Sequence, residues 1–274
     1  MAEPGLVISH LFHRRPGPRL RRLAAGAAIW SLRAQPEPDW LAPDHRRMLH
    51  WGLGPVLADF QPAFRREGLA RYLADRPVEL LSFDLGPAAR RHQGLLPLGP
   101  PLGPTAIRRH TESSIKFIRC FYQGPLAAEN YNFYPTGLYG HITEPAFIRA
   151  YLEEFDLGLA LDLAHGAVTA YHLGVEPLDY LTALPLERVA EIHLSRPWLP
   201  GNRGRGLQAV DTHLAPGPRE WQWLENILKN SRLPEAVPVF VEYYRDLYKL
   251  EQAQTQLAAR LRPRDLNPTG ENRK

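Results

Sequence analysis

From Gly54 onward, short apolar runs alternate with longer segments in which apolar residues recur every three or four positions. A short apolar run is typical of a buried strand, and the three-to-four spacing is typical of a helix that packs one face on a core. The pattern predicts six units in which a strand is followed by a helix. The six strands are expected at residues 55–60, 78–83, 125–131, 157–163, 189–194 and 237–241.

Apolar faces place the helices that separate these strands. Thr143 and Pro145 predict a helix start, because Thr can cap free backbone N–H groups and Pro is tolerated in the first turn. The other helices are expected at Phe64 to Leu73, Ile107 to Phe121, 176–184, 218–228 and 247–261.

The first fifty residues have no such alternation. Residues 6–11 and 27–32 are both short apolar runs, and Arg-rich and Pro-rich sequence separates them. Either can be the first strand, and residues 35–43 have the composition of a turn.

Strands that alternate with helices favour a parallel sheet with helices outside it. An open doubly wound sheet and a closed eight-stranded barrel both satisfy this pattern. No G-x-G-x-x-G follows any expected strand, which weakens the open dinucleotide-binding alternative. The 274 residues suit one (β/α)8 TIM barrel, which typically needs about 250 residues. We therefore predict an α/β fold with a single domain over residues 1–274, of which 263–274 form a flexible basic tail.

Composition narrows the chemistry. Cys120 is the only cysteine, so an internal disulfide and a thiolate metal site are excluded, and any metal must be held by oxygen and nitrogen. Lys and Arg number 33 against 29 Asp and Glu, a diffuse excess that does not favour nucleic-acid binding. There is no run of eighteen apolar residues and no signal-peptide order at the N-terminus, which predicts a cytoplasmic protein.

Polar residues stand where the expected strands end. Each has an ordinary explanation alone, such as a surface carboxylate, a helix cap or a core histidine. Their recurrence at equivalent positions is the stronger signal, because an unpaired charge after a buried strand is costly. Oxygen and imidazole ligands suit iron, zinc or manganese. The candidates exceed what one ion uses, so two or three metals are expected. They are Glu129, Asp162, His165, His193, Asp211, His213 and Glu242.

Two further groups have open interpretations. Asn130, Tyr131 and Asn132 can orient ligands or substrate, or can form a turn with packing aromatic residues. Three arginines lie in the long loop after residues 189–194, and they can bind an acidic peptide or phosphate or can simply be solvated. These are Arg196, Arg203 and Arg205.

The motifs together resemble the multinuclear non-haem iron-dependent oxidase family over residues 78–261. They are E-N-Y at 129, E-P-A-F-I at 144, L-D-L-A-H at 161, E-I-H-L-S at 191, D-T-H at 211 and V-E-Y-Y at 241. The resemblance implies a xylose-isomerase-like TIM barrel with two or three iron ions. It also implies oxidation of side chains, often cysteine, in ribosomally made precursor peptides by molecular oxygen, frequently with a separate protein that presents the peptide. The ligands that it implies are Glu129, Asp162, His193, Asp211, His213 and Glu242, with His165 beside them.

The chain departs from this family pattern in its early strands. Where a histidine ligand is expected after residues 78–83, the chain has Asp84, and the segment around Phe60 offers only Asp59 and Gln61. Asp84 can act as an oxygen ligand, or one metal is absent or different. Two other functions stay open: a metal-dependent hydrolase that cleaves phosphodiesters with metal-bound water, and a barrel that has become a scaffold.

Overall fold

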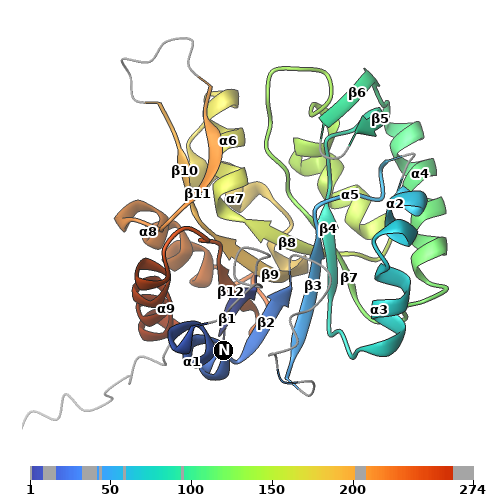
Figure 1. The fold of residues 1–274 in the computed structure, drawn as a ribbon. Coiled ribbons are helices and arrows are strands. Elements are labelled where there is room, and N and C mark those ends of the chain that lie inside the picture. The colour runs from blue at the N-terminus through green and yellow to red at the C-terminus, as the bar shows by residue number, and fades with distance from the viewer. Residues whose placement is uncertain are drawn as a thin grey trace, which may run out of the picture.

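A computed structural model describes residues 2–8, 17–32, 42, 45–57, 60–93, 96–200 and 208–261. Within these residues, eight parallel strands close into a barrel, as predicted (Figure 1). In spatial order they are β1 (Glu3–Ile8), β12 (Pro238–Val241), β9 (Val189–Leu194), β8 (Gly158–Asp162), β7 (Leu126–Glu129), β4 (Leu81–Asp84), β3 (Arg47–Trp51) and β2 (Ile29–Leu32).

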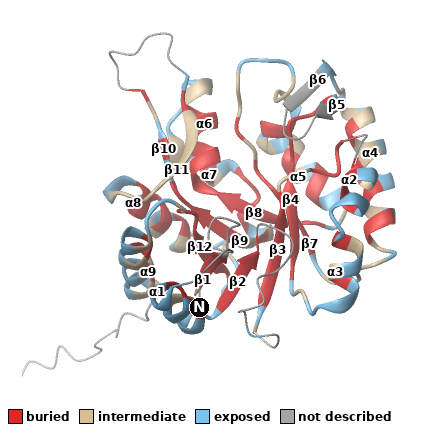
Figure 2. Ribbon diagram, viewed as in Figure 1, coloured by how far each residue is buried: buried red, intermediate tan, exposed pale blue. Residues whose placement is uncertain are grey.

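Helices surround the barrel. They are α1 (Pro18–Gly26), α2 (Phe60–Arg66), α3 (Leu69–Asp75), α4 (Pro104–Ile118), α5 (Pro145–Glu154), α6 (Leu163–Leu173), α7 (Pro177–Ala183), α8 (Pro218–Leu228) and α9 (Leu247–Leu261), with the short 3-10 turns η2 (His141–Thr143) and η3 (Leu186–Arg188). Figure 2 shows that the barrel strands are buried and that helices such as α1, α3 and α9 carry exposed residues. No helix among the described residues is both long enough and apolar enough to cross a membrane.

Two antiparallel hairpins stand at the carboxyl end of the barrel. The first joins β5 (Ala89–Gln93) to β6 (Leu96–Pro101) and follows β4 in the chain. The second joins β10 (Arg196–Trp198) to β11 (Val210–Leu214) and follows β9 (Figure 1). In barrels of this type the carboxyl ends of the strands carry the active site. The two hairpins therefore frame the face where chemistry is expected.

The strand predicted at residues 55–60 is wrong. Residues 55–57 form a turn and α2 begins at Phe60. The strand that precedes β4 is β3, whose sequence R-M-L-H-W hides its role because Arg47 and His50 interrupt the apolar run. Both expected first strands exist, since residues 6–8 belong to β1 and residues 29–32 form β2. Residues 9–16, 33–41 and the tail 262–274 lie outside the described part.

Helix prediction fails at three places. The helix expected from Phe64 to Leu73 is two helices, because Gly68 between them adopts a left-handed φ of 73°. Thr143 does not cap α5, because the N-cap of this helix is Glu144. The Thr143 hydroxyl instead donates to the carbonyl of Tyr139 at 2.8 Å. The sequence pattern does not predict helix α6, because this helix is buried around most of its surface and shows no polar stripe.

The barrel interior has an apolar floor. Seven buried residues pack together, six of them in strands and Leu80 directly before β4. Most of their neighbours in the chain pack instead in the larger core. Successive side chains of a strand point to opposite faces, so this smaller cluster fills the barrel itself. The floor residues are Val7, Ile29, Met48, Leu80, Ala127, Ala160 and Phe240.

Phe240 fills the floor at the point where β1 approaches β12. A Cβ atom built on Gly5 would lie 2.1 Å from Cε1 of the Phe240 ring, so the ring needs a glycine at that position. We expect Gly5→Ala to lower the free energy of unfolding by about 1–3 kcal/mol, because overpacking displaces the ring or the strand. Chemical denaturation followed by circular dichroism measures the change.

The matched control is Gly26→Ala at the end of α1, where an added Cβ would meet nothing within 4 Å. This substitution should be neutral or slightly stabilising, because alanine is the better helix former. Equal losses in the two variants would contradict the packing argument.

Candidate metal centre

A polar layer lies directly above the apolar floor. In six of the strands, a polar residue lies two positions after the floor residue. Side chains of a strand alternate between its two faces, so the floor residue and the polar residue both point into the barrel. Every one of these polar residues is buried. The layer contains Ser31, His50, Ser82, Glu129, Asp162 and Glu242, and Asp84 continues it one step further along β4.

A β-bulge brings β9 into the same layer. The register between β8 and β9 shifts, so that Leu159 pairs with Val189 but Ala160 pairs with Glu191. Ala190, the extra residue, packs on the floor, whereas Ile192 packs in the outer core. The bulge therefore changes the phase of the strand and aims Glu191 and His193 into the barrel, as bulges near active sites commonly do.

Glu129 is the hub of the polar layer. Its Oε1 lies 2.5 Å from Nδ1 of His193, and its Oε2 lies 3.3 Å from Nε2 of His50. The same His50 nitrogen lies 3.1 Å from Oδ1 of Asp84, and His193 Nδ1 lies 3.5 Å from Oε1 of Glu242. One carboxylate thus contacts both imidazoles.

Ligand atoms in this layer come close enough to hold ions. Three overlapping groups have ligand atoms that all lie within 4.8 Å of one another. Glu129 belongs to two of them and His193 to two. The groups are Glu129 with Asp162, His193 and Glu242; His50 with Asp84 and Glu129; and His50 with Glu191 and His193.

A second set of candidate residues lies beside Glu242. Oδ2 of Asp211 is 2.9 Å from Nδ1 of His213 and 3.5 Å from Nε2 of His165. His213 adopts a positive φ of 43°, and its Nε2 lies 2.9 Å from Oε2 of Glu242. Strand β11 therefore brings Asp211 and His213 to the edge of the polar layer.

Asn130 fixes the geometry between β7 and α6. Its side-chain amide donates to the carbonyl of Asp162 at 2.9 Å and accepts from the Asp162 N–H at 2.8 Å. Nδ1 of His165 lies 2.9 Å from the Asn130 carbonyl, which can only accept, so Nδ1 carries the proton and Nε2 faces Asp211. Asp162 also caps α6, because its Oδ1 accepts from the His165 N–H at 2.7 Å.

Burial and neighbouring charges move the pKa values of the cluster in opposite directions. Burial raises the pKa of Asp84 and that of Asp162. Burial also acts to raise the pKa of Glu129, but the charges of His50 and His193 outweigh it and hold that pKa well below its usual range. The pKa values of carboxyl groups that share a buried site move apart, because the group closest to positive charge stays ionised and the others favour the protonated form.

The donor set fits bound metal ions. Oδ2 of Asp162 is buried and makes no hydrogen bond within the described residues, an arrangement that a bound ion would satisfy. All donors are carboxylate oxygens and imidazole nitrogens, which suit iron, zinc and manganese. The residues could therefore bind metal ions.

Sequence reasoning missed two members of this cluster. His50 escapes because the apolar pattern does not reveal β3, and Glu191 enters the prediction only as part of the motif around His193. The signal that finds both is the strand period: His50 lies two residues after the floor residue Met48, and Glu191 two before His193.

The remaining candidate residues lie beside the polar layer or away from it. The ring of Tyr131 lies 5.6 Å from that of His165 and stacks on Tyr139. Asn132 is buried, and Arg196 is exposed on β10. Gln61 bonds Ser113 on α4 instead of the cluster. Arg203, Arg205 and Asp59 lie outside the described residues.

Comparison with known proteins gives a family and a fold. The family described as RiPP precursor modification enzyme MbnB/TglH/ChrH matches residues 69–261. UPF0276 proteins from two strains of Pseudomonas aeruginosa are 34% identical over 123 residues, which is 44% of this chain and 40% of each relative. A UPF0276 protein of Acaryochloris marina is 30% identical over 143 residues, 52% of this chain and 49% of the relative. The matches thus span less than half the length of these relatives.

Solved structures with the same fold have low sequence identity. A xylose isomerase domain protein from Planctomyces limnophilus has a TM-score of 0.61 at 12% identity and covers 94% of this chain and 96% of its own. Endonuclease IV from Thermus thermophilus has a TM-score of 0.56 at 17% identity, with 94% and 98% covered. These likenesses show a xylose-isomerase-like barrel.

Loss of the Asn130 side chain should destabilise the barrel. Asn130→Ala leaves the buried N–H and carbonyl of Asp162 without their partners, so we expect the free energy of unfolding to fall by about 2–4 kcal/mol. Asn226→Ala is the control, because among the described residues that exposed amide bonds only the carbonyl of Gln222, and its loss should cost less than about 0.5 kcal/mol. Urea unfolding of both variants measures the difference, and equal effects would refute the role of Asn130.

Proposed function

The chain belongs to the family of RiPP precursor modification enzymes MbnB/TglH/ChrH, and from this we propose that it oxidises a side chain of a ribosomally made precursor peptide with iron and molecular oxygen. Cysteine is the proposed target residue. The observation that carries the proposal is a buried cluster of carboxylates and imidazoles at the carboxyl end of a barrel whose sequence matches this family.

We assign the proposed ions to three sets of residues. Glu129 serves two sets, as a bridging carboxylate, and two or three ions are expected. Iron held by oxygen and imidazole ligands with open positions supplies one-electron and oxygen chemistry. The sets are Glu129 with Asp162, His193 and Glu242; His50 with Asp84 and Glu129; and His165 with Asp211 and His213.

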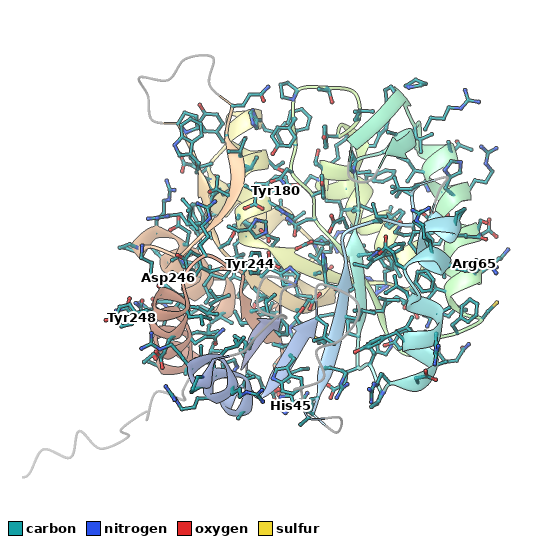
Figure 3. The ribbon with its side chains drawn as sticks, in the orientation of Figure 1. His45, Arg65, Tyr180, Tyr244, Asp246 and Tyr248 are labelled. Atoms are coloured by element: carbon teal, nitrogen blue, oxygen red, sulfur yellow. The ribbon has the colours of Figure 1, made fainter. Side chains whose placement is uncertain are left out.

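The substrate is proposed to enter beside His213. The side chain of His213 is 36% exposed, whereas those of Asp211 and Glu242, which it contacts, are only 8% and 3% exposed. Its ring lies 5.4 Å from that of Tyr244. Tyr244 follows β12 and is labelled in Figure 3. A peptide side chain that reaches this point meets the cluster from the end of the barrel that the hairpins frame.

Tyr131 is proposed to orient the substrate from beside His165. Burial raises the pKa of its phenol, and the charge of Asp84 raises it further, so the hydroxyl stays protonated and can donate a hydrogen bond. Its ring lies beside that of His165 and stacks on that of Tyr139, which holds the phenol next to the cluster. Arg196 on β10 is proposed to bind an acidic group of the peptide or of a separate protein that presents it.

Metal analysis and peptide oxidation test the proposal together. Protein produced with iron and purified without oxygen should contain more than one iron per chain. Coexpression with cysteine-containing precursor peptides of the same genome should change a peptide mass only when oxygen is supplied, as mass spectrometry measures. A single tightly bound zinc ion and no peptide product would refute the oxidase. Metal-dependent cleavage of a DNA duplex would instead favour a phosphodiesterase.

Asp211 and His213 should be required for full metal content. Asp211→Ala and His213→Ala each remove a donor at the edge of the cluster, so each should lower the metal content per chain while the circular dichroism spectrum stays unchanged, since strand-end residues are largely separate from the stabilising core. Asp75→Ala, which alters only an exposed ion pair on α3, is the control. Full occupancy and activity in both site variants would show that the assignment is wrong.

Asp84 should control one ion only. Asp84→His replaces an anionic oxygen donor with an imidazole, and we expect more bound iron or altered redox behaviour. Asp84→Ala should lose at most one ion and spare those held by Asp162, His193, Asp211, His213 and Glu242. Elemental analysis and Mössbauer spectra give the readout. If neither substitution changes them, Asp84 is not a ligand.

A further inference from the structure

His193 presents its two ring nitrogens to different groups. Nδ1 faces the carboxylates of Glu129 and Glu242, at 2.5 and 3.5 Å. Nε2 points deeper into the barrel, where Oε1 of Glu191 lies 3.4 Å away. Both residues are completely buried. An imidazole that binds an ion through one nitrogen normally carries its proton on the other, so Nε2 of His193 has a proton to donate toward Glu191.

His50 is arranged in the same way. Its Nε2 faces Asp84 and Glu129, and its Nδ1 lies 3.0 Å from the hydroxyl of Ser82. Glu191 lies close to this pair, because ligand atoms of His50, Glu191 and His193 all lie within 4.8 Å of one another. Ser82 can accept from His50 and donate to Glu191 with its single proton. The inward-facing nitrogens of both histidines therefore lead to one carboxylate.

Glu191 has no ordinary structural reason to be buried. Neither of its oxygens makes a hydrogen bond of good geometry within the described residues, and below it lies the apolar floor that contains Phe240. A buried carboxylate without such bonds is costly and calls for an explanation. The bulge at Ala190 is what aims it inward, so the fold places it there specifically.

We propose that Glu191 is a positioning residue that fixes the tautomers of two metal-binding histidines. It accepts the Nε2 proton of His193 directly and holds the Nδ1 proton of His50 through Ser82, so that Nδ1 of His193 and Nε2 of His50 keep their lone pairs for the ions. Carboxylates that hold a ligand imidazole in this way also raise its basicity. The inference rests on the proposed metal centre.

The alternative is that Glu191 binds an ion itself, together with His50 and His193. That arrangement asks His193 to use Nε2 for the deep ion while Nδ1 faces Glu129, Asp162 and Glu242. A neutral imidazole has one lone pair, so it cannot serve both positions. In the positioning role, Nδ1 of His193 stays available to the group that contains Glu129, Asp162 and Glu242, and Nε2 of His50 to the group that contains Asp84 and Glu129.

Zinc binding by Glu191→Gln separates the two roles. The amide keeps the size of the side chain but removes its charge, so the variant should bind as many Zn²⁺ ions as wild type at saturation, with an affinity about 10–100-fold weaker in chelator competition. Glu220→Gln is the matched control, because Glu220 is equally buried but caps α8 at Gly217. One fewer ion in Glu191→Gln at saturation, or an unchanged affinity, would overturn the proposal.

Ser82→Ala tests the indirect arm with a smaller change. It should weaken Zn²⁺ binding severalfold, and it should add little in the double variant with Glu191→Gln, because both act on the same chain of hydrogen bonds. Ser31→Ala is its control: Ser31 is another fully buried serine of the polar layer, and its hydroxyl has no hydrogen-bond partner within the described residues. Equal effects of the two serine substitutions would contradict the proposal.

Nitrogen-15 NMR of the histidines gives a readout that needs neither activity nor a variant. In zinc-loaded wild-type protein, His193 should be protonated on Nε2 and His50 on Nδ1, and the reverse tautomer at His193 would refute the inference even if Glu191→Gln failed to fold. Spectra of metal-free protein test the positioning role of Glu191 separately from the proposed function. A protein that binds no metal refutes the proposed function, whereas the tautomer of His193 still decides the role of Glu191.

Discussion

The structure depends on the burial of several charges in the centre of a barrel. Removing a carboxylate or an imidazolium from water costs several kcal/mol unless a partner compensates it. The barrel concentrates these groups above an apolar floor, so each must be neutralised by its neighbours. Glu129 achieves this by contact with two histidines, and its low pKa is the consequence. Asp84 and Asp162 have raised pKa values because the histidines alone do not compensate them. A divalent cation is the compensation that this donor set fits.

The period of the strands determines which residues share this environment. A residue of the floor and the polar residue two positions later point the same way, so the same register that packs Ala127 and Ala160 places Glu129 and Asp162 above them. Strand β9 would break the pattern without its bulge, since His193 would then face the helices. A single inserted residue, Ala190, therefore decides whether the cluster has this imidazole.

The same period explains what could be predicted from the sequence. Glu129, Asp162 and Glu242 are predictable because each ends an apolar run, and such runs are the signal of a buried strand. His50 is not, because Arg47 is completely buried at the start of β3 and bonds the backbone of residues 42 and 45, a tertiary arrangement that no local pattern reveals. Helix α6 escapes prediction for the opposite reason, because burial on nearly all sides removes the amphipathic stripe. Contacts such as those of Asn130 depend on two segments meeting, so the sequence offers only its place beside Glu129.

Asp84 stands where the family pattern predicts a histidine, and this difference changes the charge of the cluster. An imidazole at this position would be a neutral donor, whereas a carboxylate adds a negative charge 3.1 Å from His50. In a buried site that charge has two possible fates, because Asp84 either binds a proton, as its raised pKa favours, or shares a cation with His50 and Glu129. Burial raises the pKa of Asp162 in the same way, so a proton would compete with a cation at both carboxylates. Asp84 differs in lying against His50, so the fate of its charge also decides what that imidazole faces.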